Sequence, residues 1–529
     1  MIVIGAGLAG LSSGVALAEA GFRVKLLEQR PFLGGRASSY SLPDGEEIDN
    51  CQHVTLGCCT NLDDFYRRVG ALGKIARYER LIFVDCVGRR AVMEASALPP
   101  PLHLAASMAF YPSLSWAEKW GIAEAMLSIA RRGGRNNDGD AVGCSMLDWL
   151  RAHGQGEGAI SRFWSVVLVS ALNEELARTE ARYGLDVFWK AFVSSRSGYV
   201  VGIPRVPLGE LYEGCRAAIE QRGGEVVCRA AVRNLIQDDG RIAGVSMDGG
   251  RQHCADFYIL AVPHEAAIKL LPERIADAEP QLRQIRNLEV SPITSVHFWF
   301  DRDVMAEPFV TLLDRTTQWI FNKSRLSEGP GSGRYLQSVI SASYGLVELP
   351  RQEIINLCLG ELQQIFPEAT TARLIKATVV KETAATFSPR PGADRWRPSQ
   401  RTSLSNFFLA GDWTATGWPA TMEGAVRSGY LAAEAILSAC GDPKRLLKLI
   451  GGFGILIGLF LSLWISARLT RPIERLASGV REVSGGNWGA RVEVMLRELG
   501  GVIWIQIASA IVLLRLIIWL PFHLWRLGR

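Results

Sequence analysis

The chain has 529 residues, 48% of them hydrophobic, which is enough for two or three domains with large cores. Its 58 basic and 53 acidic residues leave a net charge of +5, and no basic tract indicates a nucleic-acid partner. The ten cysteines form no C-x-x-C pair and no His/Cys cluster at zinc spacing, so we predict reduced cytoplasmic thiols and no metal site.

The first forty residues carry a strand, a glycine-rich turn and a helix start. Residues 1–4 are apolar, as in a parallel strand covered on both faces. In Gly5-Ala-Gly7-Leu-Ala-Gly10, the first glycine can make a tight turn, the second lets backbone approach a pyrophosphate, and the third lets helix pack on strand. Glu28, at the end of the next predicted strand, can accept hydrogen bonds from ribose hydroxyls. The pattern predicts a dinucleotide site at a helix N-terminus.

Two further segments favour FAD over a nicotinamide cofactor. Gly34-Gly35-Arg36 offers a second phosphate contact of the kind found in FAD-binding folds. Residues 406–413 read as an apolar strand ending in Gly411-Asp412, where such folds hold the ribityl chain and phosphate. Residues 421–429 then start a helix whose N–H groups can face the flavin ring.

The middle of the chain divides into two kinds of segment. Residues 205–263 read as a helix followed by strands that return to the cofactor domain. We therefore predict a discontinuous FAD-binding domain of residues 1–60, 205–263 and 401–441, and a substrate domain of residues 61–204 and 264–400.

Residues 102–131 are apolar with few charges and are too interrupted to span a bilayer. Core helices are the ordinary interpretation of this segment. The alternative is a membrane-dipping entrance for an apolar substrate.

Residues 442–529 form a hydrophobic tail. Residues 449–467 contain no charge and have about the length that crosses a hydrocarbon core. Residues 500–525 are interrupted only by Arg515, which fits a weaker span or an interfacial helix. We predict a membrane anchor; two buried helices of a soluble protein are the alternative.

With these motifs in view, the chain resembles the flavin amine oxidase/phytoene desaturase superfamily. Within it, the chain is most similar to the squalene-associated FAD-dependent desaturases, the bacterial hydroxysqualene dehydroxylases of hopanoid synthesis. The resemblance covers about residues 1–440, and Cys51 stands where this group more commonly has glycine. The segments that carry it are Asp49-Asn-Cys-Gln-His53-Val54, Pro204-Arg-Val-Pro-Leu208, Lys381-Glu382, Ala385-Thr-Phe387 and, above all, Gly411–Gly429.

The resemblance implies an α/β fold in which a Rossmann-like, three-layer FAD-binding domain carries an inserted α+β substrate domain. It also implies non-covalent FAD, because covalent members attach flavin through a cysteine just before the final Gly-Asp segment, and no cysteine lies between Cys358 and Cys440. From the motifs and the resemblance together, we predict that the cofactor is bound by Gly5, Gly7, Leu8, Ala9, Gly10, Glu28, Gly35, Arg36, Gly411, Asp412, Met422 and Glu423.

The activity implied is reductive removal of the allylic hydroxyl of hydroxysqualene, giving squalene for hopanoid or triterpenoid synthesis. The protein would orient the substrate, exclude water and protonate the leaving hydroxyl. His53 and Asp49 are candidate general acids, and a structural hydrogen bond is the alternative role of His53. Trp413 and Trp418 are candidate aromatic walls beside flavin and substrate, with simple packing as the alternative.

Other activities are compatible with the same motifs. The same fold could desaturate phytoene or a similar polyene with oxidised FAD, or oxidise an amine. Residues 468–499 resemble the HAMP linker that follows a transmembrane helix in sensor kinases, but we favour an anchor of another kind or a fused tail over signalling.

The expected partners are a hydrophobic isoprenoid substrate, the membrane through the C-terminal segments, and squalene-synthase-like enzymes of the same pathway. The expected location is the cytoplasmic face of the inner membrane.

Overall fold

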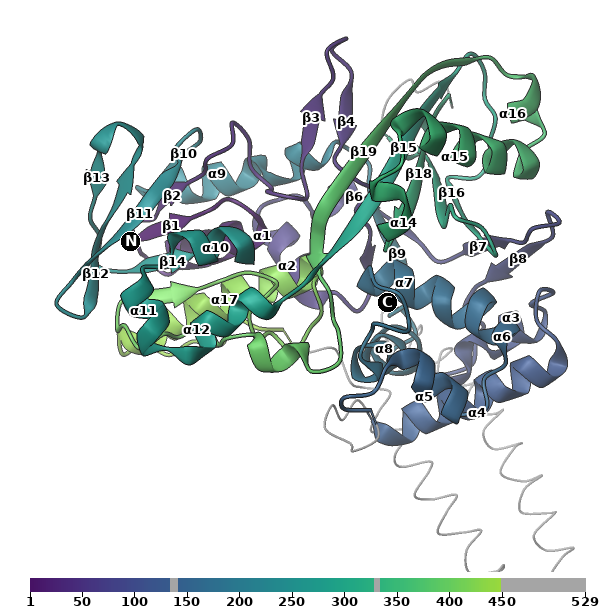
Figure 1. The fold of residues 1–529 in the computed structure, drawn as a ribbon, viewed down its shortest axis with the longest axis horizontal. Coiled ribbons are helices and arrows are strands. Elements are labelled where there is room, and N and C mark those ends of the chain that lie inside the picture. The colour runs from purple at the N-terminus through teal and green to yellow at the C-terminus, as the bar shows by residue number, and fades with distance from the viewer. Residues whose placement is uncertain (134–140, 328–333, 449–529) are drawn as a thin grey trace, which may run out of the picture. The chain divides into compact units, whose positions relative to one another are not determined.

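A computed structural model of the chain describes residues 1–133, 141–327 and 334–448 (Figure 1). The predicted anchor and HAMP-like segments begin at residue 449 and lie outside the described residues. In the described part of the chain, no helix combines the length and the apolar character that a bilayer crossing requires.

A parallel sheet holds the two ends of the described chain together. Its strand order is β10-β2-β1-β14-β20, and every neighbouring pair is parallel. The strands are β1 (Ile2–Ile4), β2 (Lys25–Leu27), β10 (Glu225–Val227), β14 (Tyr258–Leu260) and β20 (Phe407–Leu409). Strands that are some four hundred residues apart in sequence therefore lie in one sheet.

Side chains on the two faces of this sheet enter different cores because they alternate along each strand. Val3 and Leu26 pack with helices on one face, whereas Ile2, Ile4 and Leu27 pack on the other. The first face is covered by α1 (Leu8–Glu19), α9 (Glu213–Glu220) and α17 (Met422–Ala439). The second is covered by β11 (Val232–Asp238), β12 (Arg241–Met247), β13 (Gln252–His253), α10 (His264–Leu270), α11 (Glu273–Ala278) and α12 (Pro280–Gln284). The result is the three-layer α/β domain expected from the sequence.

Helices α1 and α17 cross at very short range. A Cβ added at Gly429 would lie 2.1 Å from Ser12 Oγ and 2.4 Å from the carbonyl oxygen of Ala9. Only glycine fits there, and the crossing brings the N-terminus of α17 beside the glycine-rich turn.

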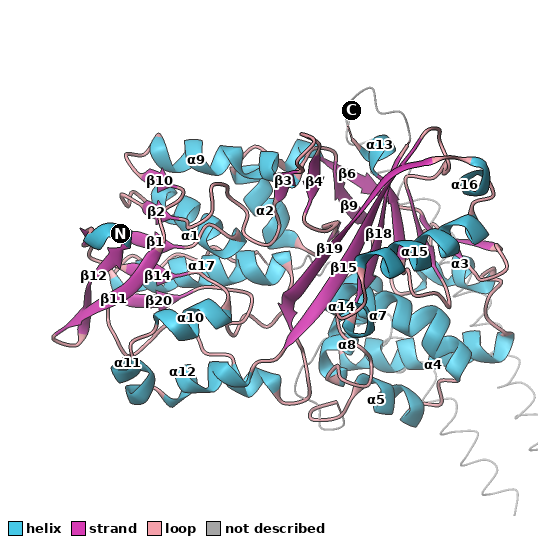
Figure 2. Cartoon of the chain, turned by 45° about the horizontal axis from the view of Figure 1, so that its top comes forward, coloured by secondary structure: helices cyan, strands magenta, loops and turns pink. Residues whose placement is uncertain are grey.

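A second, seven-stranded sheet forms the other half of the molecule (Figure 2). Its order is β19-β15-β18-β17-β16-β7-β8, and one face packs on α15 (Arg351–Ile365) through residues such as Phe298 and Leu362. The strands are β7 (Leu81–Val84), β8 (Arg90–Met93), β15 (Val290–Phe300), β16 (Phe309–Leu312), β17 (Trp319–Asn322), β18 (Tyr335–Ser341) and β19 (Leu374–Phe387).

A helical layer packs beside this sheet. It contains α3 (Ala105–Ala109), α4 (Trp116–Arg132), α5 (Met146–Ala152), α6 (Glu157–Ala159), α7 (Ser165–Leu172), α8 (Ala181–Phe188) and the π-helical turns η3 (Ile160–Trp164) and η4 (Trp189–Val193). Smaller elements include β3 (Ser39–Ser41), β4 (Glu47–Asp49), β5 (Thr55–Leu56), α2 (Thr60–Arg68), β6 (Ile75–Tyr78), η2 (Leu102–Leu104), β9 (Val201–Pro204), α13 (Lys323–Leu326), α14 (Tyr344–Val347), α16 (Glu368–Thr371) and η8 (Ala393–Trp396). The residue limits predicted for the two domains stay predictions.

Candidate flavin site

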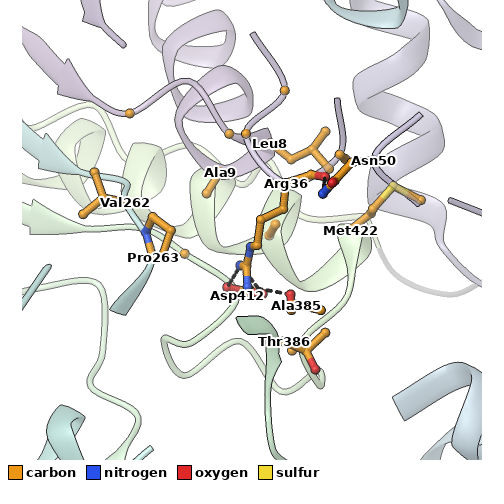
Figure 3. A pocket seen from close by; sticks show the side chains of 18 of the residues that line it. Leu8, Ala9, Arg36, Asn50, Val262, Pro263, Ala385, Thr386, Asp412 and Met422 are labelled. Carbon is orange, nitrogen blue, oxygen red and sulfur yellow. Dashed lines mark hydrogen bonds and ion pairs between the residues drawn. The ribbon is translucent and has the colours of Figure 1, made fainter. Parts of the chain in front are cut away.

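A cavity of about 350 Å³ opens at the carboxyl ends of the parallel strands (Figure 3). Gly5, Glu28, Ala261 and Gly411 line it, and each follows directly or closely on the end of β1, β2, β14 or β20. Open α/β sheets bind their ligands at this edge, and the volume falls in the range of small-molecule sites, roughly 300–1,000 Å³.

The glycine-rich turn has the geometry that phosphate binding requires. Gly5 has φ +102°, and a Cβ at Gly10 would lie 1.9 Å from the carbonyl oxygen of Gly5, so neither position accepts another residue. Gly7 lines the cavity, and a Cβ built there meets no atom within 4 Å. Any side chain at Gly7 would therefore enter the space beside the N-terminus of α1, where a pyrophosphate can approach the helix N–H groups.

Glu28 is buried at the end of β2 and holds the turn in place. Its Oε2 accepts the Ala6 N–H at 2.7 Å and its Oε1 accepts the Arg30 N–H at 2.8 Å. Each carboxylate oxygen keeps a second lone pair, so Glu28 can still accept hydrogen bonds from ribose hydroxyls.

An ion pair joins the second predicted phosphate contact to the distant Gly-Asp segment (Figure 3). Arg36 donates to both oxygens of Asp412, at 2.8 and 2.7 Å, and its other Nη donates to the carbonyl oxygen of Ala385 at 2.7 Å. Burial by itself lowers the pKa of Arg36, but the charge of Asp412 and the hydrogen bond to it raise this pKa above its ordinary value. The guanidinium thus fixes three segments around one wall of the cavity.

The far side of the cavity comes from the substrate half of the molecule. Ala171 on α7 and Ile293 on β15 give it apolar surface. Its amides are already engaged: Asn50 Nδ2 donates to the Arg36 carbonyl and to Glu382 Oε2, both at 3.0 Å. Asn173 Nδ2 donates to Thr386 Oγ1 at 2.9 Å and to the Ser291 carbonyl at 3.1 Å. These hydrogen bonds fix Asn50 and Asn173 in a wall that combines the apolar side chains of Ala171 and Ile293 with polar ones.

His53 lines the cavity and makes a local hydrogen bond. Its Nδ1 lies 2.9 Å from the Cys51 carbonyl oxygen, and burial lowers its pKa, so the neutral imidazole carries its proton on Nδ1. Nε2 is then an acceptor, and donation from this atom needs a second proton that burial disfavours. This geometry fits a structural hydrogen-bonding role of His53 better than the role of a general acid.

Asp49 is not among the residues that line the cavity. It is buried in β4, where Lys323 Nζ donates to Oδ2 at 2.7 Å, and where Ser39 Oγ and the Leu208 N–H donate to Oδ1 at 2.8 and 3.1 Å. Although burial raises the pKa of a carboxyl group, Lys323 and these donors bring the pKa of Asp49 below its ordinary value. Asp49 is therefore an ionised, fully engaged carboxylate.

Four other predicted residues also lie outside the lining. Gly10 packs under the turn. Glu423 accepts Asn61 Nδ2 at 2.7 Å and the Leu62 N–H at 2.8 Å, so it caps α2. Trp413 donates to the Val262 carbonyl at 2.9 Å and packs in the core beneath Gly411. Trp418 lies beside Lys190, whose Nζ is 4.8 Å from the ring centre.

The other predicted cofactor contacts all line the cavity: Gly5, Gly7, Leu8, Ala9, Glu28, Gly35, Arg36, Gly411, Asp412 and Met422.

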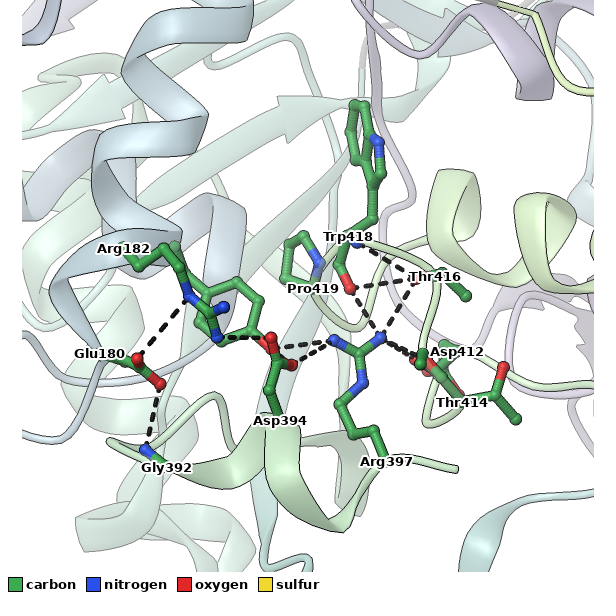
Figure 4. A network of polar contacts seen from close by, with 12 residues as sticks. Glu180, Arg182, Gly392, Asp394, Arg397, Asp412, Thr414, Thr416, Trp418 and Pro419 are labelled. Atoms are coloured by element: carbon green, nitrogen blue, oxygen red, sulfur yellow. Dashed lines mark hydrogen bonds and ion pairs between the residues drawn. The ribbon is translucent and has the colours of Figure 1, made fainter. Parts of the chain in front are cut away.

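Arg397 organises the loop that follows Asp412, and no sequence signal pointed to it (Figure 4). Its Nη2 donates to the carbonyl oxygens of Asp412, Thr414 and Trp418, at 3.0, 2.6 and 2.8 Å. Its Nη1 donates to Asp394 at 2.8 Å, and Asp394 also pairs with Arg182 at the start of α8. The cofactor loop is thereby tied to the helical layer.

Comparison with known proteins places the chain in a family. Residues 8–437 match the model of the flavin containing amine oxidoreductases, so the chain belongs to that family. It is 26% identical over 468 residues to a 15-cis-phytoene desaturase of Synechococcus elongatus, covering 84% of this chain and 97% of that protein. It is 27% identical over 474 residues to a zeta-carotene desaturase of Synechocystis sp., covering 82% and 96%.

Solved structures show the same fold. An oxidoreductase from Methanosarcina mazei superposes with a TM-score of 0.63 at 18% identity, covering 81% of this chain and 98% of that one. Cyclohexylamine oxidase from Brevibacterium oxydans superposes with a TM-score of 0.62 at 16% identity, covering 83% and 99%.

The chain is thus an FAD-dependent oxidoreductase of the amine oxidase/phytoene desaturase superfamily. The cavity fits this cofactor: Glu28 would hold its ribose, the Gly5–Gly10 turn its pyrophosphate, and Arg36, Asp412 and Met422 would lie along the remainder.

Proposed function

We propose that this oxidoreductase removes the allylic hydroxyl of hydroxysqualene and yields squalene. One structural observation supports an isoprenoid substrate: Ala171 and Ile293 give the substrate side of the cavity apolar surface, and the amide N–H groups of Asn50 and Asn173 are bound by neighbouring protein groups. The particular isoprenoid rests on the resemblance of the Asp49–Val54 and Gly411–Gly429 segments.

The reaction breaks one C–O bond and forms one C–H bond at the same allylic carbon. Reduced FAD, when bound, supplies a hydride, and the oxygen leaves as water after taking up one proton. The chain's own task is to hold the allylic carbon, exclude water and let that proton reach the oxygen. On the substrate side, the ionisable lining residues are Cys51, His53 and Glu382.

A second candidate is desaturation of phytoene or a related polyene, with oxidised FAD taking the hydride. The observation that favours it is that the curated relatives described above are carotene desaturases that match over most of the chain. The apolar surface of Ala171 and Ile293 suits either substrate.

Anaerobic turnover of the full-length holoenzyme separates these candidates. Dithionite-reduced enzyme is mixed with hydroxysqualene, and oxidised enzyme with phytoene, and the lipids are analysed by mass spectrometry. We expect squalene in the first reaction and unchanged phytoene in the second. Desaturated polyene would favour the second candidate, and unchanged hydroxysqualene with stable reduced flavin would contradict the first. A separate aerobic incubation with putrescine tests amine oxidation, because O2 reoxidises the reduced flavin and gives the peroxide that the assay detects.

We also propose that the C-terminal segments hold the enzyme at the cytoplasmic face of the inner membrane. There it would receive its substrate from squalene-synthase-like enzymes of the same pathway. The support is the uncharged run 449–467 and the low water solubility of the proposed substrate.

A further inference from the structure

Exposed large apolar side chains are concentrated in one segment of the described chain, residues 98–127. Phe110, Trp116 and Trp120 expose 86%, 74% and 70% of their surface. Together with three neighbouring leucines they form what we call the 98–127 apolar surface: Leu98, Leu102, Phe110, Trp116, Trp120 and Leu127. Single exposed apolar residues are normal on proteins, but a cluster with two tryptophans marks a surface that contacts something.

Helix α4 explains why these side chains point outward. Its inner face, with Ile122, Ala125 and Ile129, is buried in the core. Trp116, Trp120 and Leu127 are spaced by four and seven residues, so they share a second stripe on the outer side. A helix that is apolar on two sides is normally covered on both, and the described residues cover only the inner one.

The start of α4 is fixed without any help from this stripe. Ser115 and Glu118 form a reciprocal capping box, and Gly133 ends the helix in the left-handed conformation. Trp116 and Trp120 are therefore held outward by a well-terminated helix.

The chemistry around the stripe fits a lipid surface. Lys119 Nζ lies 4.6 Å from the centre of the Trp116 ring, and exposed Arg131 occupies the last turn of α4. The nearby carboxylates are engaged locally, Glu118 in the capping box and Glu124 by the Trp120 Nε1–H at 2.8 Å. Aromatic side chains whose N–H group is hydrogen-bonded, next to cationic side chains, are typical of helices that lie in the interface of an anionic membrane.

We infer that the 98–127 apolar surface docks on an anionic phospholipid bilayer, with Phe110, Trp116 and Trp120 inserted at the level of the headgroups. This contact is made by residues 98–127 and not by the residues of the C-terminal tail. Figures 1 and 2 both place α3 and α4 at the edge of the helical layer.

The docked layer also contributes to the cavity. Helix α4 packs on α8 and α8 packs on α7, and Ser170 and Ala171 of α7 line the cavity wall. If the proposed function holds, docking brings this cavity wall close to the bilayer in which the isoprenoid substrate is dissolved. The docking itself does not depend on that function.

Lipid photolabelling of the full-length holoenzyme tests the contact directly. The protein is bound to vesicles of phosphatidylcholine and phosphatidylglycerol that contain a photoactivatable phospholipid, and adducts are mapped by peptide mass spectrometry. We expect adducts in peptides covering residues 98–127. In the triple variant Phe110→Ser, Trp116→Ser, Trp120→Ser they should fall about fivefold or more, while labelling of the tail stays unchanged.

A matched control removes exposed apolar residues elsewhere. Val87 and Ile375 are 71% and 60% exposed and lie outside the surface. The double variant Val87→Ser, Ile375→Ser should leave labelling of residues 98–127 intact, and flavin content and circular dichroism report that each variant is folded.

Three results would overturn the inference. They are a lack of adducts in residues 98–127 when the tail is labelled, equal loss of labelling in the control variant, or a lipid-free dimer in sedimentation velocity that the triple variant dissociates. The last result would assign the surface to a second copy of the chain. Since the assay uses no isoprenoid, its failure is distinguishable from failure of the proposed function.

Discussion

At the scale of single residues, the Arg36–Asp412 pair is the contact that closes the cofactor site. The two residues are 376 positions apart, and the Asp412 side chain is only 9% exposed. Removing the negative charge leaves a partly buried guanidinium without its partner, which is more costly than losing a solvated ion pair.

We expect Asp412→Asn to reduce the free energy of unfolding by about 1–3 kcal/mol and to weaken FAD binding. Urea unfolding followed by circular dichroism and titration of the apoprotein with FAD measure the two effects. Asp248→Asn is the matched control, because its partner Arg233 and Asp248 itself are both more than half exposed. Equal losses in the two variants would show that the Arg36 pair has no special role.

Cys51 stands where the resembled group more commonly has glycine, and the structure shows how a thiol is accommodated. Its side chain is 4% exposed, and its Sγ lies 4.0 Å from Ser295 Oγ. Burial raises the pKa of this thiol to about 12. The residue behaves as a small apolar group in the cavity wall.

The raised pKa gives a direct prediction for alkylation. At pH 8 the Cys51 thiol stays protonated, so its reaction with iodoacetamide should be at least about a hundredfold slower than that of exposed Cys254. Peptide mass spectrometry over a time course measures both rates in one sample. Comparable rates at the two cysteines would mean that Cys51 is accessible and ionised.

At the scale of elements, the sequence predicted the helices and strands that are determined by residues close together in the chain. The strand, turn and helix at residues 2–19 follow from an apolar run and from the glycines at positions 5, 7 and 10, and the structure has them. The roles considered for Glu423 and Trp413 came from their position in a motif, and sequence position does not determine which way a side chain points. Glu423 faces α2, and Trp413 faces the core.

The Asp49–Lys323 pair shows what the sequence could not reveal. It joins β4 to α13 across 274 residues, and the segment around Lys323 has no motif that indicates a partner. Lys323 also donates to Gln52 Oε1 at 2.9 Å, so it supports the segment that lines the cavity. Such a pair can be recognised only in the folded structure, where the positions of β4 and α13 are known.

We expect Lys323→Met to lower the free energy of unfolding by about 3–5 kcal/mol at pH 7, because Asp49 is left as a buried, unpaired charge. Lys323 and the other donors hold the folded pKa of Asp49 below the ordinary value of 3.8. The pair's contribution is therefore complete above that value and is lost as pH falls through the folded pKa.

The destabilisation should accordingly be largest near neutral pH and should shrink in acid, where Asp49 of the variant becomes protonated. Urea unfolding at pH 7 and near pH 4 measures the trend. Lys25→Met, which breaks the more exposed pair with Glu225, should show a smaller loss. A pH-independent loss for Lys323→Met would assign the effect to packing.

At the scale of the whole molecule, the cofactor domain and the helical layer are connected through the loop after Asp412. The parallel sheet needs strands from both ends of the described chain, so the cofactor domain is complete only when β20 and α17 are in place. The sequence indicated this return because both ends carry flavin-type motifs. It did not indicate Arg397, which divides its hydrogen bonds between backbone carbonyl groups and side chains from separate segments, such as Tyr183 and Asp394.

We expect Arg397 to couple the helical layer to the cofactor domain. Its planar guanidinium reaches three loop carbonyl groups and Asp394 at once, and Asp394 in turn pairs with Arg182 of α8. Lysine keeps the charge but cannot present donors in two directions from a rigid plane. We expect Arg397→Lys to cost about 2–4 kcal/mol of stability, from several lost hydrogen bonds, and to weaken FAD binding, although Arg397 does not line the cavity.

Thermal unfolding and FAD titration measure both consequences, and exposed Arg395→Lys, two residues away, is the matched control. If Arg397 acts through the loop, the loss in melting temperature should be larger with saturating FAD than without it, because the variant binds FAD less tightly and therefore gains less stability from it. A variant that is destabilised to the same extent but binds FAD with unchanged affinity would show that Arg397 supports the fold alone. In that case the bonds between α8 and the cofactor loop would carry no coupling between the helical layer and the flavin site.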